Sequence, residues 1–179
     1  MRITKVYTRT GDDGTTGLAK GDRLPKDSPR IAAFGALDEV NAALGVALAE
    51  GLHDEISRTL DAAQHVLFNI GGELAVPDEN LGLVKPEDVK ELETAIDALN
   101  STLPPLEEFV LPRGSKGAAL LHQARGVCRR AERDLVILHR EEESNNLQLQ
   151  YMNRLSDYLF VAARYQNEID GGTEEMWEK

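Results

Sequence analysis

The sequence LLHQARGVCRRAERDLVILHR, residues 120–140, has the apolar spacing of a long amphipathic helix. At about 100° per residue, apolar side chains that recur every three or four positions fall on one face of a helix. The side chains on this face are Leu121, Ala124, Cys128, Ala131, Leu135 and Leu138. Such a face is stable only when other helices cover it, so the stretch predicts the central helix of a helical bundle.

A second, charged stripe lies beside this apolar face. Arg125, Arg129 and Glu132 stand at i, i+4 and i+7, so a helix brings all three to the edge of the buried seam. Two interpretations are open from the spacing alone. The side chains reach into water or pair with carboxylates of a neighbouring helix, or they form part of a functional site.

The composition favours helices and excludes one large class of function. Hydrophobic residues make up 41% of the 179 residues and aromatic residues only 5%, a balance that favours helices over sheets. The length suits one domain with a sizeable core. The net charge of −11 argues against a general nucleic-acid-binding protein, which needs a basic surface. A polyanionic ligand would therefore have to meet a local cluster of arginine and lysine.

The cysteine content and the apolar runs indicate the compartment. Cys128 is the only cysteine, which excludes an intrachain disulfide and favours a reducing compartment. We find no apolar run long enough to span a membrane, and residues 1–20 lack the core of a signal peptide. We therefore expect a cytoplasmic protein with no membrane partner and no nucleic-acid partner.

Four further segments show the helical apolar repeat. They are residues 31–50, 53–74, 86–99 and 147–169. Together with the stretch at 120–140 they predict an all-α fold, a five-helix bundle. We interpret 1–179 as a single domain that consists of an irregular segment at 1–30, the bundle at 31–170 and an acidic tail at 171–179. The tail contains Trp177, the only tryptophan.

The N-terminal segment has the residue types of a phosphate-binding loop. GDDGTTG at 11–17 combines glycines, which free backbone N–H groups, with threonine hydroxyls, and Lys26 and Arg30 follow. It is not a Walker A loop, because no lysine follows in the required GK[ST] position. A polar N-terminal arm without a ligand is the alternative that composition leaves open.

The loop at 101–116, STLPPLEEFVLPRGSK, interrupts the helical pattern with three prolines and a glycine. Phe109, Val110 and Leu111 stand together in this loop. Apolar loop residues usually anchor to the core, so core burial is the simplest expectation for all three.

Neither metal nor thiol chemistry is predicted from the remaining residues. A di-iron bundle needs Glu-x-x-His on two helices, and the four histidines do not supply that pair. Cys128 lies within the apolar stripe, so we expect a core residue and not a nucleophile.

Five segments of the chain carry a family resemblance. They are YTRTGDDGTTGL (7–18), AFGALDEVN (33–41), FVLPRGS (109–115), ARGVCRRAER (124–133) and NRLSDYLFVAAR (153–164). In this order they resemble the propanediol-utilisation type of ATP:cob(I)alamin adenosyltransferase, the corrinoid adenosyltransferases. The five segments span nearly the whole chain, and together they are highly specific. One departure is Arg113, which stands where the family more often has glycine.

The resemblance implies a helical bundle that assembles as a homotrimer with active sites at the subunit interfaces. It also implies an enzyme that transfers the 5′-deoxyadenosyl group of ATP to the cobalt of cob(I)alamin, giving adenosylcobalamin and triphosphate. Mg²⁺ would be a cofactor, and an electron-donating reductase would be a partner.

The resemblance further implies which residues hold the triphosphate. Arg129 and Glu132 would face the phosphates and their Mg²⁺, with Glu132 as a ligand of the ion. The N-terminal residues that would wrap the triphosphate are Thr8, Arg9, Thr10, Gly11, Gly14, Thr15, Thr16, Lys26 and Arg30.

Four other residues receive roles from the same resemblance. Arg125 would pair with Asp38 across the subunit interface, and Asn153 would help to hold the nucleotide. Phe109 would lie against the corrin and displace the lower axial ligand of cobalt.

The chemistry of that reaction fits these residue types. Co(I) is a strong nucleophile, so the protein needs no activated Ser, Cys or His to attack carbon 5′. It needs to align cobalt with that carbon and to stabilise the charge that grows on the leaving triphosphate. Two other classes of protein stay open: a non-catalytic ATP sensor or cobalamin carrier, and a helical scaffold whose arginine stripe is an ion-pair network.

Overall fold

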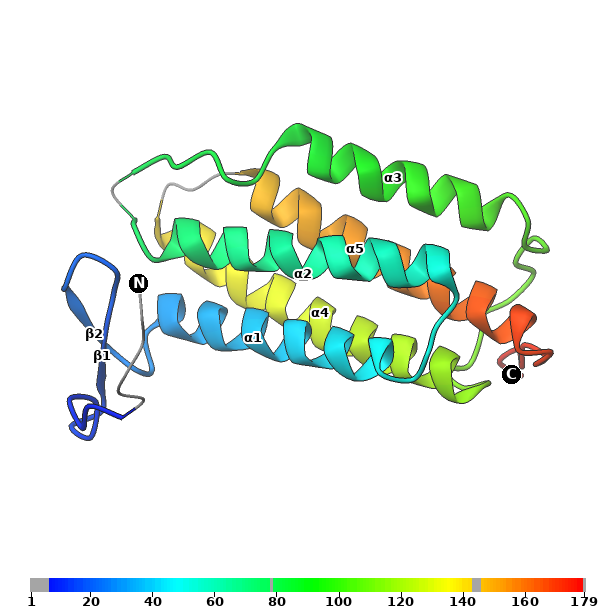
Figure 1. Ribbon diagram of the computed structural model, residues 1–179, viewed down its shortest axis with the longest axis horizontal. Coiled ribbons are helices and arrows are strands. Elements are labelled where there is room, and N and C mark those ends of the chain that lie inside the picture. The colour runs from blue at the N-terminus through cyan, green and yellow to red at the C-terminus, as the bar shows by residue number, and fades with distance from the viewer. Residues whose placement is uncertain (1–6, 78, 143–145, 179) are drawn as a thin grey trace.

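The computed structural model describes residues 7–77, 79–142 and 146–178, and these residues form a bundle of five α-helices (Figure 1). The helices are α1 (Pro29–Leu48), α2 (Asp54–Leu74), α3 (Pro86–Asn100), α4 (Lys116–Glu141) and α5 (Asn146–Ile169). The predicted all-α five-helix bundle is therefore confirmed. One addition is a small antiparallel hairpin of β1 (Thr15–Gly17) and β2 (Arg23–Pro25) in the segment that was predicted to be a loop.

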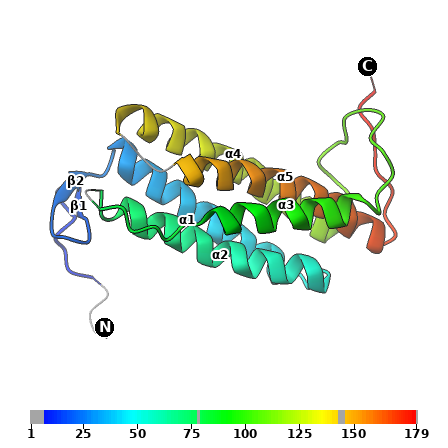
Figure 2. The same cartoon turned by 90° about the horizontal axis from the view of Figure 1, so that it is seen from above.

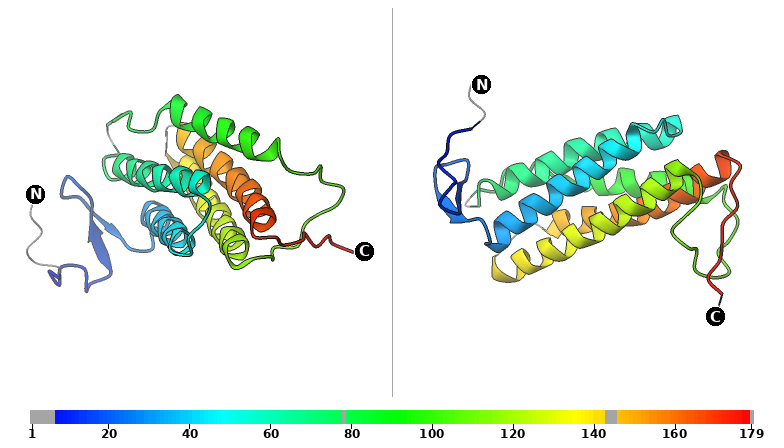
Figure 3. Two further views of the ribbon diagram at one scale, coloured as in Figure 1. Left: turned by 45° about the vertical axis from the view of Figure 1, so that its right-hand side comes forward. Right: turned by 90° about the horizontal axis from the view of Figure 1, so that it is seen from below.

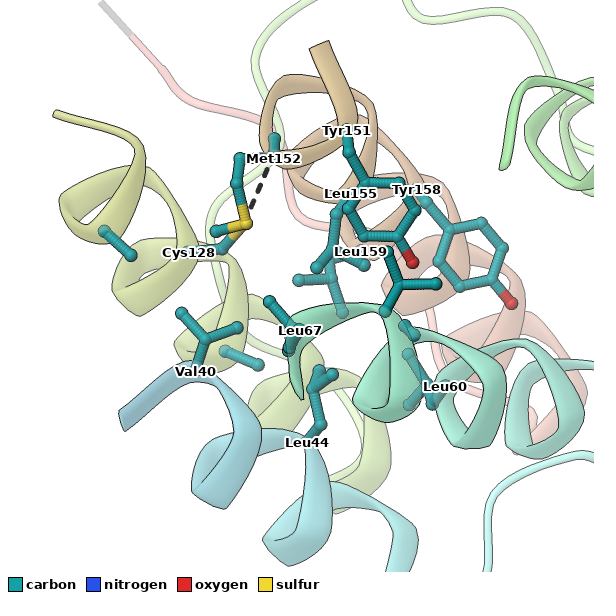
Figure 4. Close-up of a cluster of buried hydrophobic side chains, with 14 of the residues drawn as sticks. Val40, Leu44, Leu60, Leu67, Cys128, Tyr151, Met152, Leu155, Tyr158 and Leu159 are labelled. Carbon is teal, nitrogen blue, oxygen red and sulfur yellow. Dashed lines mark hydrogen bonds between the residues drawn. The ribbon is translucent and has the colours of Figure 1, made fainter. Parts of the chain in front are cut away.

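The apolar stripe of α4 is the centre of the core, as its spacing predicts. Each of its six residues is at most 1% exposed, and α4 has its most extensive contacts with α5 and α1. Figure 4 shows Cys128 from α4 beside Met152 from α5, where the thiol donates to the Met152 carbonyl oxygen at 3.5 Å. The same cluster of buried side chains in the figure includes Leu44 of α1, Leu67 of α2 and Leu155 of α5.

Close packing explains why α4 begins four residues before the predicted start. Ser115 caps the helix, and its Oγ accepts a hydrogen bond from the Ala118 N–H at 3.2 Å. Gly117 lies so close to two neighbours that a Cβ there would be 2.9 Å from Leu52 Cδ2 and 3.0 Å from Gln166 Cγ. A larger residue at position 117 would have to displace the Leu52 or Gln166 side chain, so glycine suits this close approach.

The hairpin segment, residues 7–28, lies at one end of the bundle, just before α1 (Figure 1). In the hairpin Thr15 pairs with Pro25, Thr16 with Leu24 and Gly17 with Arg23. The strands are too short for an alternating pattern to be visible in the sequence. Residues 1–6 of the predicted loop lie outside the described residues.

Helix α1 corrects the expectation that no segment is apolar enough to span a membrane. By length and composition alone it passes that test, with a mean hydropathy of 1.5. It nevertheless carries Asp38 and Glu39 at mid-length, and charge inside a bilayer is costly. Its buried face packs in the bundle against α2 and α4. Its exposed residues include Ala42 and Val46 beside Asp38, so the outward face is partly apolar.

The opposite end of the bundle holds two segments that are distant in sequence. Residues 101–115 and the tail 170–178 run side by side there, as two views agree (Figures 2 and 3). Val110 and Met176 form an antiparallel β-bridge. We call these two segments the loop–tail unit. The acidic tail is thus part of the fold, a contact that its composition did not predict.

Candidate functional site

The charged stripe of α4 lies where the sequence places it, at the edge of the buried seam next to α5. Arg125 is half-buried, with its guanidinium carbon 5.2 Å from the centre of the Phe160 ring. Burial and the neighbouring Arg129 lower the pKa of Arg125, while Asp157 opposes that shift. An arginine keeps its charge at neutral pH even so, which leaves a partly desolvated cation on this face.

Glu132 and Asn153 meet across α4 and α5. The Asn153 Nδ2 donates to Glu132 Oε1 at 3.3 Å, and Asn153 Oδ1 accepts from Arg154 Nη1 at 2.7 Å. Both Glu132 and Asn153 are only partly exposed. The pair therefore presents a carboxylate and an amide in fixed positions beside the two arginines.

Arg129 lacks the carboxylate partner that two nearby arginines have. Arg130 pairs with Glu39 of α1, and Arg154 donates to Glu93 of α3 at 2.9 Å. The exposed Arg129 side chain has no such carboxylate partner among the described residues, and neither does Arg125. Surface arginines that do not find a partner in their own chain are available to an anionic ligand or to another subunit.

Asp38 lies on the outward face of α1 and is exposed. It has no cationic partner within the described part of the chain. The structure therefore does not bring Asp38 and Arg125 together inside one subunit. Their predicted pairing requires a second chain.

The hairpin segment folds through contacts between its own side chains and backbone. Asp13 Oδ1 accepts from the Thr15 N–H at 3.0 Å and from the Thr15 hydroxyl at 2.7 Å, which lowers the pKa of Asp13. Arg23 donates to the Thr15 hydroxyl at 3.0 Å through Nε and to the Thr10 carbonyl oxygen. Thr8 and Thr10 share a hydroxyl hydrogen bond of 2.8 Å.

Lys26 closes the same turn from the other side. Its Nζ donates to the Gly11 carbonyl oxygen at 2.8 Å, and Gly14, at φ +84°, supplies a backbone conformation that favours glycine. Arg9 also has a positive φ of 61°, and its guanidinium lies 5.7 Å from the Tyr7 ring centre. Thr16 is half-buried in β1. The predicted loop residues are therefore gathered in one turn, where glycine N–H groups, hydroxyls and cations are close together.

Arg30 lies apart from that turn. It is 7% exposed and donates to the Leu74 carbonyl oxygen at 2.6 Å and to Glu142. It lines an open cavity of about 610 Å³ at this end of the bundle, between α2, α4 and α5. The sequence singled out its charge but could not reveal a partner 112 residues away. Arg30 thus holds helix ends together, and no other predicted site residue lines that cavity.

Phe109 does not anchor the loop in the core, in contrast to the simplest expectation for apolar loop residues. Its side chain is 76% exposed, while Val110 and Leu111 are half-buried. The nearest aromatic ring is that of Trp177 in the tail, at 6.4 Å between centres and nearly edge-on. A large exposed ring on a fixed loop is typical of a contact surface.

Sequence reasoning missed the residues that hold the loop–tail unit. Arg164, which is 2% exposed, binds Glu174, and Asn167, which is 3% exposed, binds the backbone of the loop and of the tail. Arg164 ends the segment 153–164 that carries part of the family resemblance, but its partner Glu174 could not be predicted from the sequence.

The residues predicted to form the site are spread along the length of α4, from one end of the bundle to the other. The Phe109 loop precedes the N-terminus of α4, Arg125 and Arg129 lie in its middle, and the hairpin segment lies at the end where α4 stops (Figure 1). At 1.5 Å per residue, Ser115 and Arg129 are about 20 Å apart along the helix. An elongated ligand that lies along α4 would meet an apolar end, a cationic middle and a polar turn.

The described residues contain no group of three or more His, Cys, Asp or Glu side chains that could hold a metal ion. Glu132 is a single, oriented carboxylate. That suits Mg²⁺, which usually takes one or two carboxylates and completes its shell with water and phosphate oxygens.

Comparison with known proteins identifies the family. The model of the cobalamin adenosyltransferase family matches residues 6–166. A cobalamin adenosyltransferase of Cupriavidus metallidurans is 46% identical over 99% of this chain and 96% of its own length. A corrinoid adenosyltransferase of Bacillus subtilis is 47% identical over 93% of this chain and 89% of its own.

Solved structures agree with the sequence comparisons. A phenylalanine-to-alanine variant of a PduO-type ATP:corrinoid adenosyltransferase from Lactobacillus reuteri, complexed with cobalamin and ATP, superposes with a TM-score of 0.92. It is 35% identical, and the match covers 98% of this chain and all of that one. An arginine-to-lysine variant complexed with ATP gives a TM-score of 0.90 at 36% identity over 97% of this chain and all of that one.

Proposed function

Because the chain belongs to the cobalamin adenosyltransferase family and is an ATP:corrinoid adenosyltransferase, we propose that its active site is built from two subunits along α4. The observation that carries this proposal is that, among the described residues of one chain, Asp38, Arg125 and Arg129 form no ion pair. The enzyme forms adenosylcobalamin from ATP.

The reaction makes one bond and breaks one. The electron pair of Co(I) attacks carbon 5′ of ATP, a cobalt–carbon bond forms, and the bond from carbon 5′ to the triphosphate oxygen breaks with its electrons leaving on that oxygen. No proton has to move at the attacking atom. The protein therefore contributes alignment and stabilisation of the leaving charge.

Arg129 and the hairpin segment would bind the leaving triphosphate. Arg129 is exposed and pairs with no carboxylate among the described residues, so its planar guanidinium is available to bind two phosphate oxygens. The hairpin segment supplies hydroxyls and backbone N–H groups around one turn. The hydroxyls belong to Thr8, Thr10, Thr15 and Thr16, and the N–H groups to Gly11 and Gly14. Arg9 and Lys26 add charge there, whereas Arg30 acts by fixing the ends of the helices.

Glu132 and Asn153 would hold the middle of the nucleotide. Their mutual hydrogen bond of 3.3 Å is long enough to yield to a ligand atom. Mg²⁺ would neutralise part of the phosphate charge, with Glu132 as its protein ligand. Asn153 would then orient that carboxylate.

Phe109 would cover the lower face of cobalt. Its ring stands out from the protein, so it can exclude water or a base from a bound corrin. Loss of the lower ligand makes Co(II) easier to reduce to Co(I). An electron-donating reductase would be the partner that supplies the electron.

A homotrimer would cover the outward face of α1. This face carries Gly35, Asp38, Ala42 and Val46 at helical spacing, and Val46 is 56% exposed. Phe68 of α2 and Ile137 of α4 are also exposed, at 71% and 48%. Exposed apolar residues around an exposed aspartate suit a subunit interface in which Asp38 meets Arg125 of a second chain. A single buried cysteine suits a cytoplasmic location.

Subunit complementation tests the shared site. Asp38→Asn and Arg129→Ala would each inactivate a homotrimer, because each removes one side of every interface. When the two inactive variants are mixed and exchange subunits, each trimer that contains both variants has one intact interface out of three. After random mixing we therefore expect about a quarter of the wild-type turnover to return. Circular dichroism and sedimentation would show that the single variants stay folded.

The control mixes Arg125→Ala with Arg129→Ala, which remove two groups from the same side of the interface. This mixture should stay inactive. Equal recovery in both mixtures, or none in the first one despite proven exchange, contradicts a site shared between chains.

A further inference from the structure

The loop that carries Phe109 is held by the tail through its backbone. The Trp177 N–H donates to the Phe109 carbonyl oxygen at 2.7 Å, and the Leu111 N–H donates to the Glu175 carbonyl oxygen at 2.8 Å. These bonds flank the bridge between Val110 and Met176. The exposed Phe109 ring therefore stands on a two-stranded support and is not seated in a core pocket.

The final turns of α5 anchor both segments at once. Arg164 donates to Glu174 through Nε at 2.5 Å and through Nη2 at 3.0 Å, and Nη2 also reaches the Pro104 carbonyl oxygen at 2.9 Å. The side chains of Arg164 and Glu174 are 2% and 16% exposed. A guanidinium buried this deeply needs its carboxylate, since the loss of one partner leaves an uncompensated charge.

Asn167, one turn later in α5, also contacts both the loop and the tail. Its Oδ1 accepts from the Ser115 N–H at 2.8 Å, and its backbone oxygen accepts from the Gly172 N–H at 2.8 Å. Arg164 thus joins the start of the loop to the tail, and Asn167 joins the end of the loop to the tail. The loop and the tail share their anchors, so a change in one is transmitted to the other.

Arg113, the residue that departs from the family pattern, has a partner in the loop–tail unit. It forms an ion pair with Glu175, and both side chains are more than half exposed. Exposed pairs contribute little stability, roughly 0–1 kcal/mol. This pair instead adds a side-chain contact to the backbone pairing of Leu111 with Glu175, which favours one register of tail against loop.

We propose that the tail, residues 173–177, is a positioning strap that fixes the Phe109 loop, with Arg164 and Glu174 as its anchor and Trp177 as the support of the Phe109 ring. Glu174, Glu175 and Trp177 are then positioning residues for the adenosyl transfer. The effect on the reaction rests on the proposed role of Phe109 at cobalt. The mechanical part, that the tail sets the loop, stands on the contacts alone.

Hydrogen exchange of the full-length Glu174→Gln variant tests the mechanical part. A neutral amide cannot hold the Arg164 guanidinium as a carboxylate does, so we expect the amides of residues 107–112 and 173–177 to lose protection together, by about 10-fold or more. Glu168→Gln changes an exposed carboxylate of the same helix and should leave both segments as they are. Opening of 173–177 with unchanged protection at 107–112 would overturn the strap.

The Trp177→Ala variant tests the functional part and avoids the buried charge. We expect turnover with a weak biological reductant to fall about 10-fold, because a displaced Phe109 ring no longer excludes the lower ligand, while turnover with ready-made Co(I) changes little. Trp177→Phe, which keeps an aromatic ring, should restore most of the loss. An unchanged ratio of the two turnovers in Trp177→Ala overturns the positioning role.

Phe109→Ala, assayed in parallel, separates the two proposals. A reductant-dependent loss in Phe109→Ala without one in Trp177→Ala contradicts the strap and keeps the role of Phe109. No such loss in Phe109→Ala contradicts the role of Phe109, and the exchange experiment then decides about the strap by itself.

Discussion

The hairpin segment and the loop–tail unit are both irregular and lie at opposite ends of one bundle, but they are held in different ways (Figure 1). The hairpin segment is held by exposed polar contacts within itself, among them Arg23 to Thr15 and Lys26 to Gly11. An ion pair between Lys20 and Glu79 at 2.5 Å and a backbone hydrogen bond from the Ala19 N–H to the Ala75 carbonyl oxygen at 3.4 Å link it to the chain after α2. The loop–tail unit is held by Arg164 and Asn167, which are almost completely buried.

The difference shows how each region can bind a ligand. In the hairpin segment the groups that hold the structure are the groups that phosphate would attract, so a ligand would replace internal bonds and the turn would adjust around it. In the loop–tail unit the holding residues are separate from the exposed Phe109, so the ring can be presented in a fixed place. The first region suits a charged, flexible ligand, and the second a rigid, apolar one.

The largest expected effect concerns Arg129, which lies in the middle of α4 and would share the triphosphate with the hairpin segment. Arg129→Ala should lower turnover by about 10²–10³-fold, because it removes a donor aimed at the growing charge of the leaving group. Arg129→Lys should recover only part of this, since an ammonium cannot replace a planar fork. Steady-state turnover with saturating ATP measures it, and Arg130→Ala, whose partner Glu39 is in the same chain, is the control.

Phe109→Ala is the corresponding change on the apolar side. We expect turnover with a weak reductant to fall about 10–100-fold, with much smaller loss when Co(I) is supplied ready-made. Because the ring is 76% exposed, the melting temperature should hardly change, unlike the case of a buried phenylalanine, which costs about 3–5 kcal/mol. A large fall in melting temperature with equal loss in both assays would contradict the assignment.

Two glycines at positive φ compare the rigidity of the two regions directly. At Gly114, φ +135°, a Cβ would overlap the buried Asn167 amide, whereas at Gly14, φ +84°, nothing lies within 4 Å of a Cβ. Gly114→Ala should cost about 2–4 kcal/mol, from strain and the lost bond to Ser115. Gly14→Ala should cost only about 1 kcal/mol, the strain alone. Urea unfolding measures both, and equal costs would remove the contrast.

The smallest expected effect is a difference in response to acid. Burial, and then Arg125, lower the pKa of His122, and Glu174 opposes the shift. The unfolded chain therefore binds the proton more readily than the folded one, and stability at the loop–tail end should fall as the pH drops below about 6.5. Asp13 has a lowered pKa instead, so its contribution in the hairpin segment is lost only near pH 4 and below.

Thermal melts at pH 7.5 and pH 5.5 measure the response of His122. His122→Gln should reduce the difference between the two melting temperatures. Burial also lowers the pKa of His139, near the other end of α4, so His139→Gln is the matched variant for that end. If His122→Gln leaves the acid response of the whole chain unchanged, its folded pKa is not the cause.

The sequence predicted the parts of the fold that depend on local repeats. The apolar stripes of α2 and α4 are buried throughout, and the four long helices begin and end within a few residues of the predictions. Failures occurred where structure depends on one contact between distant residues. Arg30 meets Glu142, and Arg164 meets Glu174, and neither pair has a spacing that a repeat could reveal. The exposure of Phe109 was likewise invisible, because it follows from how the tail pairs with the loop.

Cys128 has a practical consequence for experiments on both ends. Burial first, and then Glu132, raise the pKa of its thiol to about 12, so the thiol stays protonated at neutral pH. It is also the only cysteine of the chain. Towards maleimides and alkylating spin labels the native protein should therefore behave as if it contained no thiol. A cysteine introduced at Thr10 or at Trp177 would take up one label at one known place. The mobility of the hairpin segment and of the tail could then be read in the same chain, with no background to subtract.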